Sequence, residues 1–345
     1  MRTFLRASLL LICIGITLYR LFFDLGRLPA ERWDEETNLH VVNTIIALHI
    51  FPALSLDGSP FFEKPPLWYW TAAVSGMLFS DSLIAIRTIS AIAGFLTISI
   101  IAWTATKWWG AIAGFTSWFV LITTNHIFIK NPAGIFSTHT FRSADVDSLY
   151  IFFLTLSFIA SCSQLNFRSK SLLTGVFSAL AILTKGPIGV LPFIFLPKKS
   201  LFQAIIICTI LVIPWYTYMT VTFGQPFIST HILYHLIQRS MSPIEGHTNP
   251  WWYFVSLLTN RAFFLSWELA FLSVIWPIIH RTHVHDRLVR ATIVMFILCL
   301  IIPSAAQTRL AWYILPFYPF AALSIGALAA SFHDQLHAIW YSKGK

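Results

Sequence analysis

The sequence predicts an all-α integral membrane protein with about 10 transmembrane helices, and three observations support this fold class. Hydrophobic residues make up 57% of the chain and charged residues only 11%, and the mean hydropathy is +0.71. Apolar runs recur along nearly the whole chain, and inside a bilayer only helices and closed barrels satisfy every backbone polar group. No Gly/Ser-rich linker or low-complexity tract interrupts these runs. Residues 1–345 are therefore expected to form one polytopic domain.

The first element is a basic N-terminus followed by an apolar run over 7–23, which we interpret as a retained span because no small-residue cleavage site follows it. The first outer loop, 24–83, comes next. Its apolar segment 66–80 is short and rich in Trp and Tyr, so we expect an interfacial helix there. A large outer loop covers 221–252, and the short polar tail after 331 leaves no soluble C-terminal domain. The remaining expected spans are 84–106, 111–129, 146–162, 170–184, 187–197, 200–220, 253–277, 289–305 and 311–331.

The charge distribution gives these spans an orientation. With the N-terminus inside, twelve of the 23 basic residues fall in short inner loops, as the positive-inside rule requires. Eleven of the fourteen acids then fall outside, and that rule does not explain this asymmetry. Ionisable residues beside a membrane span indicate a functional site, so we expect the site in the outer loops. If 66–80 crossed the bilayer, Asp145 and Asp147 would instead lie inside, and the site would be divided.

The sequence does not support nucleic-acid binding, a cysteine-based metal or disulfide site, or the use of a soluble nucleotide donor. The net charge of +9 follows from the membrane orientation, and no basic helix or aromatic-interleaved patch indicates a nucleic-acid partner. The four cysteines are isolated in apolar runs, without metal-ligand spacing or an obvious disulfide partner. No phosphate-binding glycine loop of the Walker or Rossmann type indicates a soluble nucleotide donor.

The candidate catalytic residues are acids of the outer loops. Asp34 and Glu35 follow the first span, where a carboxylate can take the proton from an acceptor hydroxyl; the alternative is a solvated helix start with Asp34 as N-cap. Asp145 and Asp147 can bind a cation or orient a sugar, or else cap the next helix. We select as catalytic candidates Asp34, Glu35 and Asp147.

The candidate phosphate-binding residues are mainly cations of four outer segments. Fixed cations suit a leaving group that gains negative charge, and two prolines that fix the backbone follow one of them directly. The alternative is a set of snorkelling lysines and of aromatic and basic belt residues at the membrane interface. The predicted donor-binding set is Glu63, Lys64, Lys185, Arg239, Arg309 and Tyr313.

A divalent metal ion is a further possibility, since a loop histidine can join a carboxylate as a ligand. The candidate ligands are Glu63, His235 and His247. Lone histidines are more often ordinary interfacial residues, so the sequence does not establish a cofactor. The histidine-rich run 280–286 falls in an inner loop of this topology, and we interpret it as a solvated charged turn.

Taken in order, these motifs resemble the GT-C membrane glycosyltransferases of the aminoarabinose transferase (ArnT-like) and protein O-mannosyltransferase group. The similarity runs from about residue 30 to 320, and its most specific block is Glu63-Lys64-Pro65-Pro66-Leu67. Other matching positions are Asp34-Glu35, Arg87, Leu183-Thr184-Lys185-Gly186-Pro187, Gln238-Arg239, His247, Pro250-Trp251-Trp252-Tyr253 and Tyr313-Ile314-Leu315-Pro316.

The resemblance implies transfer of a sugar, with inversion, from a polyprenyl-phosphate donor at the extracytoplasmic face of the plasma (inner) membrane. It implies Asp34 as the base and Glu63 and Lys64 beside the donor phosphate, with Lys185 and Arg239 near it. The donor and membrane lipids are the expected partners, and the acceptor can be a lipid, a glycan or a protein. Arg309 replaces a lysine common in relatives, and many relatives continue into further spans and an outer domain. A transporter or flippase of lipid-linked sugars is the alternative, because it needs the same cations but no base.

Overall fold

The computed structural model describes residues 2–49, 51–79, 81–128, 139–244, 246–262, 266–280 and 286–343. Within these ranges the chain is almost entirely helical, which confirms the predicted fold class. The α-helices are α1 (Arg2–Phe22), α2 (Asp34–Leu48), α3 (Leu67–Gly76), α4 (Ser82–Trp109), α5 (Ala111–Thr123), α6 (Asp147–Cys162), α7 (Phe167–Thr184), α8 (Lys198–Phe223), α9 (Gln225–Phe227), α10 (Arg239–Met241), α11 (Tyr253–Leu257), α12 (Ser266–His280), α13 (Arg287–Ala305) and α14 (Phe317–Lys343).

Shorter elements connect these helices. Strands β1 (Ser55–Leu56) and β2 (Ser59–Pro60) form a small antiparallel hairpin in the first loop. The 3₁₀ turns are η1 (Asn125–Ile127), η2 (Pro187–Phe195) and η5 (Ala311–Ile314), and the π-helical stretches are η3 (Ile228–Gln238) and η4 (Leu258–Ala262).

Four helical stretches in the described part of the chain are long and apolar enough to cross a membrane. They cover Ser82–Trp109, Lys198–Phe223, Arg287–Ala305 and Ala311–Trp340. Shorter apolar helices cover Ala7–Phe22, Ala111–Thr123, Asp147–Cys162 and Ser266–Ile279. All eight lie within or overlap spans expected from the sequence.

Two of the expected spans are not continuous α-helices. The segment 187–197 forms the nine-residue turn η2, which rises about 18 Å and cannot cross a hydrocarbon core of about 30 Å. The segment 253–277 is divided into α11, η4 and α12, with residues 263–265 outside the described part. Pro192 contributes to the first departure, because a proline inside a helix removes a backbone donor and clashes with the preceding turn.

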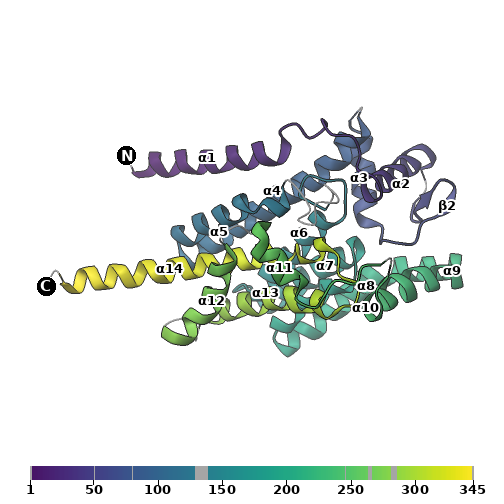
Figure 1. Cartoon of the computed structure of the whole chain (residues 1–345). Helices are drawn as coiled ribbons and strands as arrows, with labels where there is room; N and C mark the ends of the chain where they lie inside the picture. Colours follow the sequence, from purple (N-terminus) through teal and green to yellow (C-terminus); the bar gives the residue numbers. More distant parts are fainter. Residues whose placement is uncertain are drawn as a thin grey trace.

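The first outer loop packs as a layer on the N-terminal end of α4. Val41, Ile45, Trp68 and Tyr69 are buried together with Ile86 of α4. Helix α3 has ten residues and is about 15 Å long, which is too short to span the bilayer, in agreement with the expected interfacial helix over 66–80. Figure 1 shows α2, α3 and the hairpin at one end of the molecule, whereas both termini lie at the other end.

Helices α4, α5 and α14 lie side by side and form the centre of the structure (Figure 1). Small residues permit this close packing, as is usual between helices in membranes. A Cβ atom on Gly326 of α14 would lie 2.2 Å from Ser117 Oγ of α5, and one on Gly114 would lie 1.8 Å from Thr106 Oγ1 of α4. Ser117 also donates to the Ala322 carbonyl at 2.9 Å. Helices α6, α7 and α8 pack beside this centre.

Candidate active site

Four segments far apart in the sequence meet at the end of the molecule that carries the first loop. Asp34 begins α2, Lys64 precedes α3, Asp147 begins α6, and Lys185 follows α7. Lys64 Nζ donates to Asp34 Oδ1 at 2.6 Å, and Lys185 Nζ forms an ion pair with Asp147 Oδ1. The two pairs are joined through His139. The structure thus places Asp34, Lys64, Asp147 and Lys185 in one cluster, as the sequence prediction required.

His139 lies between the two carboxylates. Its Nε2 is 3.0 Å from Asp34 Oδ2 and its Nδ1 is 2.7 Å from Asp147 Oδ2, while its backbone N–H donates to Asp145 Oδ2 at 2.7 Å. The ring stacks on Trp312 with a centroid distance of 3.9 Å and an interplanar angle of 4°. Because each ring nitrogen faces a carboxylate, both nitrogens act as donors and the side chain is an imidazolium.

The electrostatics of the cluster keep Asp34 ionised. Burial favours the neutral carboxyl, but Lys64 and His139 together hold the pKa of Asp34 well below its ordinary value. Burial alone would lower the pKa of His139, whereas Asp34 and the hydrogen bond to Asp147 raise it to about 9. Burial raises the pKa of Asp145 to about 6, although His139 opposes this shift. Positive and negative charges therefore alternate along the cluster, in the order Lys64, Asp34, His139, Asp147, Lys185.

Aromatic side chains line the Lys185 end of the cluster. Lys185 Nζ is 5.5 Å from the ring centroid of Tyr313 and 5.9 Å from that of Tyr150, distances at which a cation is attracted to the ring face. Gly186 and Pro187 end α7 directly after the lysine. The predicted donor-binding residue Tyr313 therefore lies beside Lys185, and the helix break places the ammonium group at the outer end of α7.

Glu35 is turned away from this cluster, although it follows Asp34 directly. Its carboxylate is 1% exposed and accepts from Arg87 Nε at 3.0 Å and Nη2 at 2.7 Å. It also accepts backbone N–H groups of Glu31 and Ala144 at 3.0 and 2.6 Å. These bonds attach the first loop to α4 and to the segment before α6. The structure therefore places Glu35 outside the cluster, where it holds the loop in place, and its catalytic role stays a prediction.

Arg309 also has structural partners. Its Nε donates to the Ser304 carbonyl at 3.0 Å, and its Nη1 donates to the Asn249 carbonyl at 2.5 Å. Asn249 Nδ2 in return donates to the Arg309 carbonyl at 3.0 Å. The side chain is buried between two loops, so the structure places the guanidinium on backbone carbonyls, and its role as a phosphate ligand stays a prediction.

Arg239 begins α10 and lies close enough to His235 to affect its ionisation. Burial, Arg239, His231 and Lys64 all lower the pKa of His235, to about 4. His231 is held by the Phe62 carbonyl, 2.7 Å from its Nδ1, and so connects η3 to the residue pair before Lys64. The loop over 221–252 therefore brings one further cation, Arg239, and two neutral histidines to the Lys64 side of the cluster.

The predicted metal ligands Glu63, His235 and His247 do not form a ligand group. Among the described residues, the one group of three such side chains with ligand atoms within 4.8 Å of one another is His139, Asp145 and Asp147. Imidazole nitrogen and carboxylate oxygens suit a divalent cation, but here their atoms are bonded to groups of the chain, and the charge of Asp147 is balanced by His139 and Lys185. The predicted set of Glu63, His235 and His247 stays a prediction, and the described residues place a different group of possible ligands, His139, Asp145 and Asp147, within reach of one another.

Two members of the cluster, His139 and Trp312, were missed in the sequence. The candidate motif around Asp145 began at residue 141, and His139 stands eight positions before Asp147 without ligand spacing. Trp312 directly precedes Tyr313, which was selected. In a chain with twelve histidines, residue type alone could not distinguish this one.

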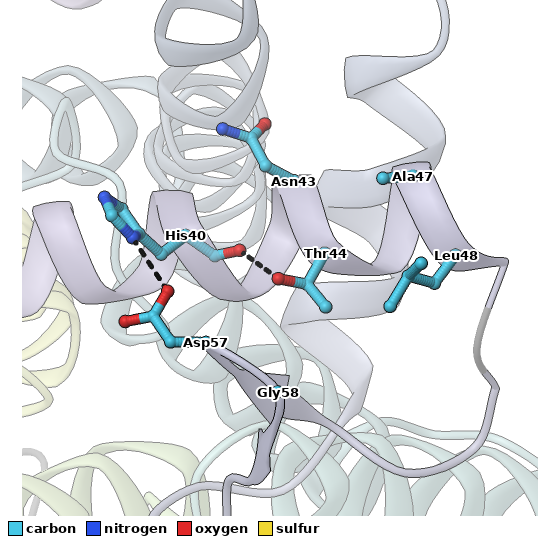
Figure 2. A pocket seen from close by; sticks show the side chains of 7 residues that line it. All are labelled: His40, Asn43, Thr44, Ala47, Leu48, Asp57 and Gly58. Carbon is cyan, nitrogen blue, oxygen red and sulfur yellow. Dashed lines mark hydrogen bonds and ion pairs between the residues drawn. The ribbon is translucent and has the colours of Figure 1, made fainter.

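A pocket of about 430 Å³ lies apart from the cluster, between α2 and the β1–β2 hairpin. Figure 2 shows His40 directed toward Asp57, with Nδ1 3.4 Å from Oδ1. Both side chains are exposed, and the lining comes from the exposed face of α2 and the hairpin turn. The pocket therefore does not share the buried charged groups of the cluster.

Comparisons with known proteins support the fold. No protein-family model matches the chain. An uncharacterized Aquifex aeolicus protein is 26% identical over 316 residues, covering 88% of this chain and 70% of that protein. An undecaprenyl phosphate-alpha-4-amino-4-deoxy-L-arabinose arabinosyl transferase of Pseudomonas fluorescens is 23% identical over 299 residues, covering 81% of this chain and 50% of that enzyme. A transferase of the same name from Shewanella sediminis is 24% identical over 302 residues, with coverages of 80% and 51%.

Solved structures agree. ArnT from Cupriavidus metallidurans bound to undecaprenyl phosphate matches with a TM-score of 0.75 at 20% identity, covering 93% of this chain and 60% of that one. The oligosaccharyltransferase AglB from Archaeoglobus fulgidus, in complex with an inhibitory peptide and a dolichol-phosphate, matches with a TM-score of 0.54 at 12% identity, with coverages of 99% and 52%. The chain therefore has the ArnT-like GT-C fold that the motifs indicated. It spans about half the length of the named transferases it matches.

Proposed function

From the GT-C fold and the charged cluster, we propose that the chain is a membrane glycosyltransferase that moves a sugar from a polyprenyl-phosphate donor to a hydroxyl or similar acceptor. The anomeric carbon loses its bond to the phosphate oxygen and gains one to the acceptor oxygen, with inversion. The acceptor proton goes to a carboxylate, and polyprenyl phosphate leaves. The named relatives carry undecaprenyl phosphate in their names, and solved neighbours hold undecaprenyl or dolichol phosphate, which supports a lipid-phosphate donor.

The pairing of Asp34 with Lys64 carries this proposal. Lys64 Nζ contacts Asp34 Oδ1 at 2.6 Å. In an inverting displacement the base and the leaving phosphate lie on opposite faces of the reacting carbon, so this contact opens when the donor binds, and Lys64 turns to the phosphate while Asp34 faces the acceptor. Both are partly exposed, at 29% for Asp34 and 19% for Lys64, so a ligand can reach them. Asp147 and His139 are buried, and the same ligand therefore has less access to them than to Asp34 and Lys64.

Donor binding activates the base in this scheme. The donor phosphate competes with Asp34 for Lys64, and the ammonium group moves its hydrogen bond toward the phosphate. Asp34 Oδ1 then loses its cationic partner, its pKa rises toward the ordinary value, and the oxygen can accept the acceptor proton. Lys185, beside Tyr313, supplies a second cation for the charge that grows on the leaving phosphate.

The site belongs, in this proposal, to the extracytoplasmic face of the plasma (inner) membrane. The cluster lies at the end of the molecule opposite both termini (Figure 1), and the short loops on the side of the termini hold the excess of lysine and arginine.

A transfer assay with purified protein tests the proposal. Asp34→Asn should lower turnover by about 10²- to 10⁴-fold, because the amide cannot act as a general base. Asp57→Asn, an exposed acid of the same loop, is the matched control and should keep wild-type turnover. The assay follows transfer from polyprenyl-phosphate sugars to envelope lipid and glycan acceptors in detergent micelles. Turnover of Asp34→Asn within threefold of wild type would contradict the role of Asp34 as base.

A further inference from the structure

His139 is fixed more firmly than any other part of the charged cluster. Its side chain is 3% exposed, both ring nitrogens are engaged, and its backbone N–H is held by Asp145. Trp312 covers the ring with a nearly parallel indole. Rotation of the imidazole would break two charge-assisted hydrogen bonds and the stack at once.

The partners of His139 come from two different loops. Asp34 is 105 positions away in the sequence, whereas Asp147 is eight positions away. Of the two Asp34 oxygens, Oδ2 faces His139 and Oδ1 faces Lys64. A carboxylate rotates freely unless both of its oxygens are held, so the imidazolium determines which Asp34 oxygen faces the cation.

We propose that His139 is a positioning residue for sugar transfer, which bridges Asp34 to Asp147 and so keeps one oxygen of Asp34 directed at the reacting centre. This role rests on the proposed transferase function and acts through Asp34, not through contact with the donor. Without the bridge, the Asp34 carboxylate is free to rotate, and its basic oxygen is no longer held in the direction of the acceptor hydroxyl. The bridge also gives Asp147 a second partner, so that Lys185 is not its sole counter-charge.

The charged surroundings keep His139 protonated over the working range of pH. The titratable groups that face it are Asp34 from α2, Asp145 and Asp147 from the start of α6, Lys64 and Lys185 beyond these acids, and His126 from η1. The acids raise the pKa of His139 to about 9. The bridge is therefore present below pH 9 and is lost as the pH rises through that value.

Kinetics of His139→Gln test the proposal. Glutamine can donate to one carboxylate but cannot bridge two with a positive charge. We expect kcat to fall by about 10- to 100-fold, as for other residues that orient a reactive group, while KM for the lipid-phosphate donor changes less than about threefold. The wild-type rate should fall above pH 9, and this basic limb should be absent in His139→Gln.

A matched variant separates this role from loss of packing. His126→Gln also removes a buried histidine, but one whose Nδ1 hydrogen-bonds to the Tyr318 hydroxyl at 2.6 Å and that bridges no pair of carboxylates among the described residues. This variant should have a lower thermal stability, but its transfer rate should still fall above about pH 9. The positioning role would be overturned if His139→Gln retained at least a third of the wild-type kcat and its transfer rate still fell above pH 9. The proposed function would then still stand. A wild-type protein that transfers no sugar would overturn the proposed function, and this role with it.

Discussion

The ion pair between Arg87 and Glu35 provides the sharpest test of how the first loop is held. Arg87 donates five hydrogen bonds: two to the Glu35 carboxylate and three to backbone carbonyls of Leu25, Leu28 and Pro29. The side chains are 6% and 1% exposed. Arg87→Met keeps an apolar side chain of similar length in α4 but removes every donor, and so leaves Glu35 as a buried charge.

The expected cost follows from this burial. An exposed ion pair contributes at most about 1 kcal/mol, but removal of one partner from a buried pair costs about 3–5 kcal/mol because the remaining charge is uncompensated. The folded-to-unfolded ratio should therefore fall by roughly a hundred- to several-thousandfold. Glu35 keeps the N–H groups of Glu31 and Ala144, so the lower half of this range is more consistent with the geometry.

Denaturant unfolding in detergent micelles measures this change in the free energy of unfolding. The double variant Arg87→Met with Glu35→Leu removes both charges and should be less destabilised than Arg87→Met alone. A loss below about 1 kcal/mol in Arg87→Met would show that the pair behaves like an exposed one. A double variant at least as unstable as Arg87→Met would show that the buried charge is not the cause.

Two further predictions concern donor binding and packing. Burial and Arg239 keep the pKa of His235 at about 4, so a phosphate bound nearby should raise this pKa. The affinity for polyprenyl phosphate, measured by a fluorescence binding assay, should then increase as the pH falls from 8 to 5. The His235→Gln variant should show no such increase. A pH-independent affinity in the wild type would place the phosphate elsewhere. Gly326→Ala should destabilise the protein by about 1–3 kcal/mol, because its Cβ would meet Ser117, whereas Gly15→Ala has nothing within 4 Å and should not. Equal thermal stabilities of these two variants would contradict the close packing of α5 and α14.

The sequence was most informative about which charged residues lie together in the cluster. Charged residues make up only 11% of the chain, so those in outer loops next to apolar spans stood out. Asp34, Lys64, Asp147 and Lys185 were selected on this basis, and the structure brings all four together. Their roles in transfer are still predictions.

The side chains that the structure places outside the cluster have a common physical cause for their position. Asp34 and Glu35 are adjacent in the sequence, yet successive residues of a helix differ by about 100° in direction, so one faces the cluster and the other faces Arg87. Arg309 carries the charge expected of a phosphate ligand, but backbone carbonyls take its guanidinium. Residue type indicates what a side chain can bind, whereas its neighbours in space determine what it does bind.

By itself, the sequence determined that this protein is a helical membrane protein with acids and cations concentrated in the loops next to its apolar helices. Hydrophobic burial and backbone hydrogen bonding act along continuous stretches of chain, and composition reports them directly. Only the tertiary structure decided that His139 joins Asp34 to Asp147 and that Glu35 belongs to Arg87. These contacts connect residues up to 105 positions apart, and charge pairs form according to distances of a few ångströms that no spacing in the sequence encodes.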